Sequence, residues 1–197
     1  MQITVKVAVA RGRALGIVDN IGGSMVAVSG CDADAVQSYI DAALALSGKD
    51  VNGTSQLYLA SFNSPVDIGV SGSEDLLLTL ADYINRWVPG ASARKLRVST
   101  AVHSPFVAPC EESYRKELVA IFSEHPGDHI PTIPVISTVT GEFITTPYTV
   151  DYLWQNIRQP VLFSTAIPKL VERYGELTTF VEVSPHPVLS QVLDEVW

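Results

Sequence analysis

The sequence contains no apolar run approaching the ~20 residues that a membrane-spanning helix needs, and its N-terminus lacks the layout of a signal peptide. It also contains no run of lysine or arginine. Its 13 basic residues stand against 21 acidic ones, which gives a net charge of −8. These absences argue against a membrane or a nucleic acid as the partner, and we expect a cytoplasmic protein.

Cysteine and metal-ligand patterns are equally sparse. The two cysteines, Cys31 and Cys110, do not form a C-x-x-C pair, so we expect free thiols and not a disulfide. The four histidines show no zinc-ligand spacing, and His125 and His129 fall in a stretch rich in Pro, Gly and Asp. The sequence therefore predicts neither a disulfide framework nor a metal site.

What the chain does contain is material for a core. Of its 197 residues 47% are hydrophobic and 17% are charged, and no internal repeat or low-complexity segment interrupts them. This length and composition suit one large domain or two small lobes.

The first half of the chain shows a clear order of elements. Residues 3–17 predict a helix, with Gly16 as its C-cap, and we assign residues 1–21 to a large lobe. Between residues 22 and 100 the pattern predicts β, α, β, β, α and β elements, which is the ferredoxin-like arrangement. The expected ranges are 24–28, 32–46, 56–61, 67–71, 74–87 and 95–99.

Residues 101–197 follow a different pattern. We expect helices at 109–122, 149–157, 167–174 and from about 188, and strands at 134–139 and 179–183. Alternating helices and strands are typical of an α/β layer. Two strands do not make a stable sheet, however, so this part is predicted to be an incomplete lobe of α/β class.

Two side chains stand out as candidates for chemistry. His103 follows a predicted strand and precedes Ser104-Pro105, a place where an acid/base group often lies, although a surface or capping histidine fits as well. Arg11 lies near an apolar helix face, where it is either a snorkelling surface arginine or a fork that binds a carboxylate.

Short segments spread over the whole chain carry a resemblance. They are residues 5–13, 25–28, 62–65 with 70–72, 101–105, 134–137 with 140–141, 154–161, and 180–189 with its Pro185-His186-Pro187 turn. In this order they resemble the acyltransferase domain of type I polyketide synthases, and they are also similar to the malonyl transacylase of bacterial fatty acid synthesis.

The resemblance implies an α/β-hydrolase-like lobe into which a ferredoxin-like lobe is inserted. It also implies a two-step transfer, in which a serine attacks an acyl-CoA thioester and the phosphopantetheine thiol of an acyl carrier protein then captures the acyl group. No bound cofactor is implied. A neighbouring ketosynthase domain is a further implied partner.

The resemblance also assigns roles to residues. His103 corresponds to the general base, Asn156 to the residue whose oxygen orients the imidazole, and Arg11 to the arginine that binds the free carboxylate of malonyl-type groups. Asn63 corresponds to an asparagine at the lobe junction, although a turn residue before Ser64-Pro65 fits equally. Val102 stands where malonyl enzymes have Phe and methylmalonyl enzymes have Ser, so the extender unit is left open.

The sequence departs from the family at the nucleophile. It contains no Gly-His-Ser-x-Gly elbow, and the nearest match, Gly22-Gly23-Ser24, lacks the closing glycine. The glutamine loop of the oxyanion hole is missing too, so the chain corresponds to about the C-terminal two thirds of such a domain. We therefore predict that these residues alone have no transacylase activity.

Other functions stay open at this point. The ferredoxin-like lobe could be a non-catalytic binding or interaction module, and a plain hydrolase is a third option. A basic group could face an acidic carrier protein or be ordinary surface charge: Arg86, Arg94, Lys95 and Arg97. We also expect the helices at 109–122 and 188–196 to leave apolar faces uncovered.

Overall fold

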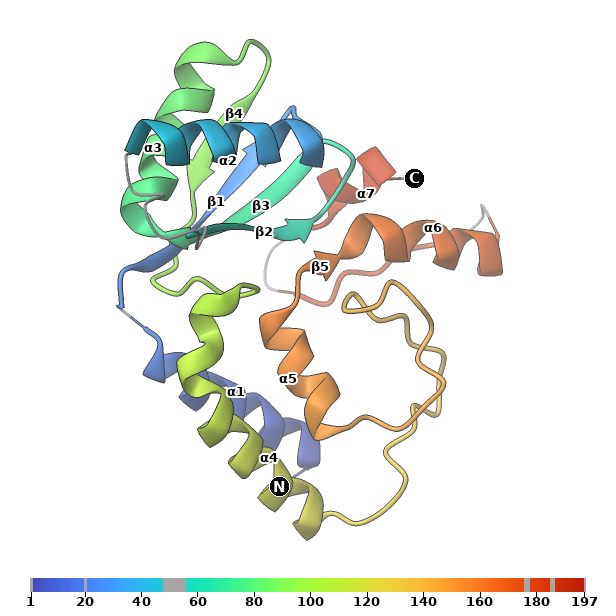
Figure 1. Ribbon diagram of the computed structural model, residues 1–197. Coiled ribbons are helices and arrows are strands. Elements are labelled where there is room, and N and C mark those ends of the chain that lie inside the picture. The colour runs from blue at the N-terminus through green and yellow to red at the C-terminus, as the bar shows by residue number, and fades with distance from the viewer. Residues whose placement is uncertain (1, 20, 48–55, 176–177, 185–186, 197) are drawn as a thin grey trace.

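The computed structural model describes residues 2–19, 21–47, 56–175, 178–184 and 187–196 (Figure 1). A five-stranded sheet has the order β4-β1-β3-β2-β5. Its strands are β1 Gly23–Ser29, β2 Leu57–Phe62, β3 Asp67–Ser73, β4 Ser92–Lys95 and β5 Val161–Leu162. The helices are α1 Ile3–Ile17, α2 Ala33–Ser47, α3 Glu74–Trp87, the 3-10 helix η2 Pro105–Cys110, α4 Glu111–Glu124, α5 Val150–Arg158, α6 Phe163–Tyr174 and α7 Ser190–Val196.

The first four strands and α2 and α3 form one layered unit. β1 pairs antiparallel with β3 and β4, and β2 pairs antiparallel with β3. Figure 1 shows α2 and α3 on one face of this sheet, where a shared core buries Val26, Ile68, Ile40 and Leu77. The predicted α/β class and the βαββαβ order of elements are confirmed.

Local chemistry explains where these elements begin and end. The Asp32 carboxylate accepts a hydrogen bond of 2.8 Å from the Ala35 backbone N–H, which caps the start of α2. Gly72 must be glycine, because a Cβ there would lie 1.9 Å from the Gln56 carbonyl oxygen. Close backbone approach therefore sets the end of the β2–β3 hairpin.

The last strand of this unit is displaced from its predicted range of 95–99. β4 is Ser92–Lys95. The Asn85 side chain forms two hydrogen bonds of 2.9 Å with the backbone of Ala93, which fix this strand at the sheet edge. The chain leaves the sheet after Leu96, whose N–H donates to the Met25 carbonyl over 2.9 Å. The strand therefore does not extend to His103, and residues 97–104 form a loop.

A second core joins α1, η2, α4 and α5. Ala10 and Ala14 of α1 are buried against α4, where their small side chains allow close packing with Leu118. Trp154 and Ile157 add the buried face of α5. A helix was predicted at 109–122, but the structure has the 3-10 helix η2 up to Cys110 and α4 from Glu111. The 3-10 helix forms because Pro105 and the Ser104 cap start a tighter turn before α4 begins.

Two predicted strands are wrong. Residues 134–139 form only an isolated bridge, between Ile136 and Phe143, and residues 179–183 are not assigned to a strand. Residues 134–139 do accept single backbone hydrogen bonds, from Ile144 to Val135 and from Leu162 to Thr138, but these do not continue into a ladder. α6 also begins at Phe163, earlier than the predicted 167.

β5 connects the two parts of the molecule. It is the parallel neighbour of β2, with Ser61 opposite Val161 and Phe62 opposite Leu162. Because β5 follows α5 after a short turn, this pairing holds the C-terminal end of α5 beside the sheet (Figure 1). No helix among the described residues is long and apolar enough to cross a membrane.

Candidate functional site

His103 lies in a loop with an unusual backbone conformation. Its φ is +58°, the only positive value found for a non-glycine residue in the described chain. The next residue, Ser104, is buried, and its hydroxyl donates to the Ala101 carbonyl over 2.7 Å. Such a conformation costs about 1–3 kcal/mol and persists only where the surroundings enforce it, which is common at functional sites.

The C-terminal end of α5 holds His103 at two points. The His103 backbone N–H donates to the Ile157 carbonyl over 2.9 Å. Its ring atom Nδ1 lies 2.9 Å from the Gln159 carbonyl oxygen. Backbone and side chain are therefore both fixed by one helix end.

The sequence explains why α5 offers these carbonyls. Gln159 precedes Pro160, and the residue before a proline favours an extended conformation, so the helix ends at Arg158. The last carbonyls of a helix have no partner within it. The Gln159 side chain donates back to the Gln155 side chain over 2.9 Å. Gln159 therefore contacts the His103 ring through its backbone carbonyl.

This contact decides which ring nitrogen of His103 can act as a base. A carbonyl oxygen only accepts hydrogen bonds, so Nδ1 must carry the hydrogen, and Nε2 of the neutral ring has a free lone pair. Burial lowers the pKa of His103 below its ordinary value, the Gln159 contact opposes this, and the Arg11 charge lowers the pKa further. The ring is therefore neutral, and a base, at physiological pH.

Arg11 and Asn156 form the other polar contact of the site. Nη1 of Arg11, on α1, donates to the Asn156 side-chain oxygen on α5. That this oxygen orients the His103 imidazole stays a prediction, because in this structure the Asn156 oxygen contacts Arg11 and the ring contacts the Gln159 carbonyl. The Gln159 carbonyl lies there because Pro160 ends the helix just where its last carbonyls face the ring.

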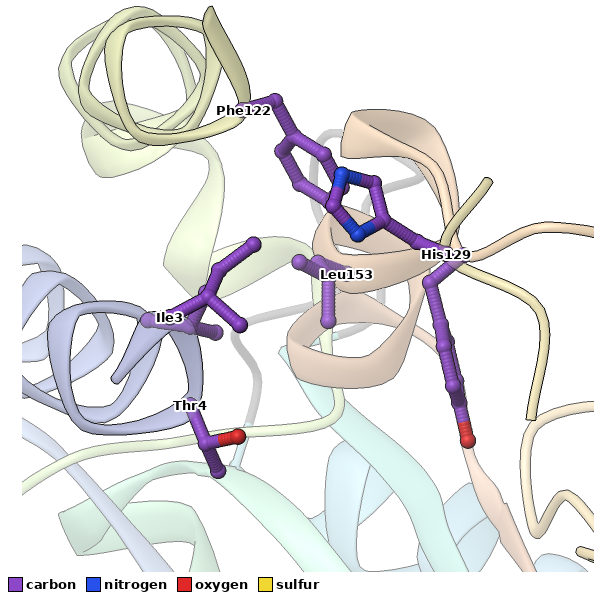
Figure 2. Close-up of a pocket in the computed structure, with 7 residues that line it drawn as sticks. Ile3, Thr4, Phe122, His129 and Leu153 are labelled. Atoms are coloured by element: carbon purple, nitrogen blue, oxygen red, sulfur yellow. The ribbon is translucent and has the colours of Figure 1, made fainter. Parts of the chain in front are cut away.

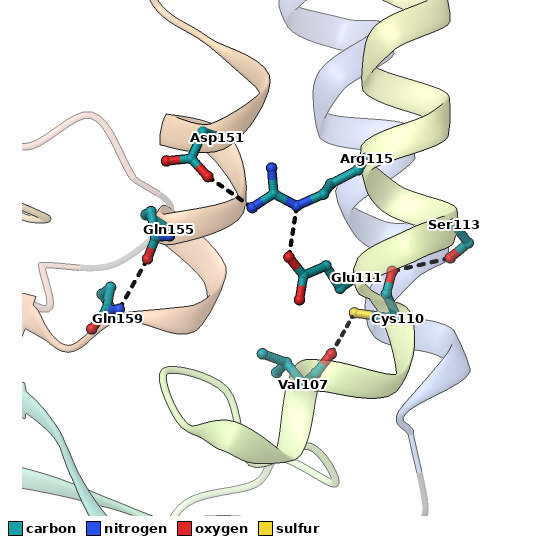
Figure 3. A network of polar contacts seen from close by, with 8 residues as sticks. All are labelled: Val107, Cys110, Glu111, Ser113, Arg115, Asp151, Gln155 and Gln159. Atoms are coloured by element: carbon teal, nitrogen blue, oxygen red, sulfur yellow. Dashed lines mark hydrogen bonds and ion pairs between the residues drawn. The ribbon is translucent and has the colours of Figure 1, made fainter.

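An ion-pair network fixes α5 against α4 (Figure 3). Arg115 on α4 donates to Glu111 over 2.7 Å and to Asp151 on α5 over 2.7 Å. The Arg115 guanidinium also lies 5.8 Å from the centre of the Trp154 ring. This network sets the position of the helix that carries Asn156 and contacts His103.

The structure does not bring every predicted residue to His103. The Asn63 side chain donates to Asp67 over 2.8 Å and its backbone N–H donates to the Asp67 carbonyl over 3.0 Å, which places it in the β2–β3 turn. Val102 packs, half-buried, against the helical core beside the histidine. Pro185 and His186 lie outside the described residues.

Two cavities lie away from this site. One has a volume of about 320 Å³ and lies near the start of α1, where Ile3, Val7 and Leu153 form an apolar wall. Figure 2 shows His129 and Phe122 at this cavity, and their ring centres lie 4.7 Å apart. A larger one, of about 550 Å³, lies between the sheet and α7 and includes Asn63 and Arg94. Neither is lined by His103, Arg11 or Asn156.

The predicted basic group is partly neutralised. Arg86 pairs with Asp82 over 2.7 Å, and Lys95 pairs with Glu74. Arg94 and Arg97 are exposed. No group of three or more metal-ligating side chains occurs in the described ranges.

Sequence reasoning missed Gln159, because its contribution is a backbone carbonyl that any residue could supply. The Gln159-Pro160 pair was the available signal, since a residue before proline marks a helix end with free carbonyls.

Comparison with known proteins gives the family. The family model described as the acyl transferase domain matches residues 9–196 of this chain. The highly reducing polyketide synthase stpks1 of Strobilurus tenacellus is 33% identical over 193 residues, which cover 98% of this chain and 6% of that protein.

Solved structures agree. The malonyl CoA-acyl carrier protein transacylase of Clostridium perfringens is 26% identical with a TM-score of 0.79, over 98% of this chain and 57% of that one. The acyltransferase domain from module 8 of the salinomycin polyketide synthase is 34% identical with a TM-score of 0.78, over 98% of this chain and 41% of that one. This chain therefore spans less than two thirds of these relatives.

Proposed function

This chain belongs to the acyl transferase domain family, and we propose that it supplies the general base and the acyl-binding arginine of a domain that loads acyl carrier protein. The acyl group comes from acyl-CoA and ends on the phosphopantetheine thiol of the carrier protein. The relatives that are polyketide synthases support a place in such a synthase. We further propose that the domain lies beside a ketosynthase domain and in the cytoplasm.

The observation that carries this proposal is the contact between His103 and the Gln159 carbonyl. It leaves Nε2 as the basic nitrogen, so His103 can remove the proton from a serine hydroxyl as the serine attacks the thioester. The same nitrogen then returns the proton to the leaving CoA thiolate. In the second step it takes the proton of the phosphopantetheine thiol and returns it to the serine.

The serine itself is provided by polypeptide outside these residues, because no Gly-His-Ser-x-Gly elbow occurs in the sequence. The oxyanion donors come from the same source. Residues 1–197 therefore contribute the base and the binding group but not the nucleophile, and they are inactive alone.

Arg11 supports a substrate that carries a free carboxylate, such as a malonyl group. A guanidinium presents donors in a fixed fork that matches a carboxylate. Val102 beside His103 is intermediate in size and excludes neither malonyl nor methylmalonyl units by shape. The exposed Arg94 and Arg97 provide a surface for the acidic carrier protein.

The test is acyl loading by the domain completed with a serine-bearing segment. We expect His103→Ala to abolish transfer from both malonyl-CoA and acetyl-CoA, and a covalent acyl-enzyme to be detected by mass for the parent domain only. Incubation of residues 1–197 alone with malonyl-CoA should give no mass shift. Full loading by His103→Ala would refute the role of this residue.

A non-catalytic interaction module is the second candidate. It is favoured by the separate core of the βαββαβ unit, which contains none of the residues Arg11, His103 and Asn156. If the completed domain loads no acyl group while residues 22–100 still bind a carrier protein, this reading becomes the better one.

A further inference from the structure

Arg11 is held by a neutral partner, and this distinguishes it from the ion-paired cations of the described chain. Those cations contact carboxylates: Lys6 with Glu124, Arg13 with Glu117, Arg86 with Asp82, Lys95 with Glu74, Arg115 with Glu111 and Asp151, and Lys169 with Glu142. Arg11 instead donates to the Asn156 amide oxygen. An amide fixes the guanidinium in place without neutralising its charge.

The environment of Arg11 makes this arrangement informative. The neighbouring Ala10 is fully buried, and Arg11 itself is only half-buried, so its side chain leaves a packed helix face toward α5. Its charge reaches both His103 and the buried Tyr114 on α4. A half-buried cation without a carboxylate is expected to be stabilised by an anion that the site is built to receive.

From this contact we infer that Asn156 is a positioning residue for Arg11, and that it holds the guanidinium toward the carboxylate of the acyl group. This rests on the proposed function for the identity of the anion. An arginine side chain loses rotamer entropy when it is fixed, and a contact made in advance reduces that loss on binding. One Nη donates to Asn156, and the other guanidinium donors make no hydrogen bond within the described part of the chain, so they can bind a carboxylate.

The inference gives Asn156 a role different from the one that the family resemblance assigns to it. Gln159 fixes the imidazole through its carbonyl, and Asn156 fixes the guanidinium through its amide. Asn156 lies one helical turn before Gln159, so a single helix end sets both the base and the acyl-binding group. Loss of the Asn156 side chain should therefore alter substrate choice and leave the tautomer of His103 unchanged.

The test compares Asn156→Ala, Asn156→Asp and the control Gln155→Ala in the 197-residue protein. Binding of malonyl-CoA and acetyl-CoA is measured by calorimetry, and the His103 tautomer is read from the ring ¹⁵N shifts. We expect Asn156→Ala to weaken malonyl-CoA binding about tenfold, or about 1.4 kcal/mol, and acetyl-CoA binding little, because the guanidinium is then no longer fixed before the carboxylate binds.

Asn156→Asp tests the importance of the neutral partner. It keeps the acceptor oxygen but neutralises the Arg11 charge, so malonyl-CoA binding should again weaken while the Arg11 side chain stays ordered in its ¹⁵Nε relaxation. Gln155→Ala should leave both affinities and the tautomer unchanged.

Two results would overturn the inference. One is a change of the His103 tautomer in Asn156→Ala without a change in the preference between the two CoA esters, which would make Asn156 the partner of the imidazole. The other is an unchanged ¹⁵Nε relaxation of Arg11 in Asn156→Ala. If the parent protein itself shows no preference for malonyl-CoA, the proposed substrate class fails, and the relaxation result still decides whether Asn156 holds Arg11.

Discussion

His103, Arg11 and Asn156 come together from three separate segments, and each takes its position from a backbone feature. His103 has a positive φ and is held by carbonyls of Ile157 and Gln159. Arg11 leaves a helix whose alanines pack on α4. Residue types singled out His103 and Arg11 as candidates, but the contact partner of each could not be read from residue type alone.

Burial is the main cause of the lowered pKa of His103, and the Arg11 charge should lower this pKa further. A nearby positive charge disfavours the imidazolium, so we expect Arg11→Gln to raise the pKa of His103 above that of the parent protein. NMR titration of the histidine Cε1–H signals measures this. Arg13→Gln is the matched control on the same helix, because Arg13 is 70% exposed and pairs with Glu117. An unchanged or lower pKa in Arg11→Gln would show that the two groups do not interact.

Helices and strands whose positions are determined by their own local sequence were predicted well. The helix at residues 3–17 and the first βαββα elements follow from periodicity, turn residues and the Asp32 cap. The strands at 134–139 and 179–183 could not be predicted correctly, because strand formation depends on continuous pairing with other segments, which the sequence of one segment does not reveal. Likewise, Asn156 pairs with Arg11 only because α1 and α5 meet across α4, a contact between residues 145 positions apart.

At the element scale, the packing of α4 should dominate the stability of the helical core. Leu118 is fully buried, whereas the adjacent Val119 is 55% exposed. We expect Leu118→Ala to lower the free energy of unfolding by about 2–5 kcal/mol and Val119→Ala by less than about 0.5 kcal/mol. Urea denaturation followed by circular dichroism gives both values. Similar losses for the two variants would mean that α4 does not pack as described.

The whole molecule combines a well-covered sheet unit with a poorly covered C-terminal part. α7 has no buried residues, and Val181 and Val183 are 80% and 96% exposed. These two valines alternate along residues 179–183, so they expose one apolar edge that a further element could cover. The predicted incomplete lobe is consistent with this exposure, although its relation to a hydrolase-like fold stays a prediction.

The exposed apolar edge should make the isolated protein prone to aggregation. We expect it to bind the dye ANS and to self-associate at micromolar concentration, and we expect Val183→Ser to reduce both effects. Leu78→Ser is the control, because Leu78 is a single exposed apolar residue, 49% exposed, on α3. Dye fluorescence and light scattering measure the outcome. A parent protein that is monomeric and binds no dye would contradict the expectation.

We propose that this site selects acyl groups with a free carboxylate through Arg11. The ratio of malonyl to acetyl loading by the completed domain, compared between Arg11→Ala and the nearby variant Arg13→Ala, tests this selection. We expect Arg11→Ala to lose malonyl loading while acetyl loading persists, and Arg13→Ala to keep the parent ratio. Equal loss of both substrates in Arg11→Ala, or no loss of either, would contradict it.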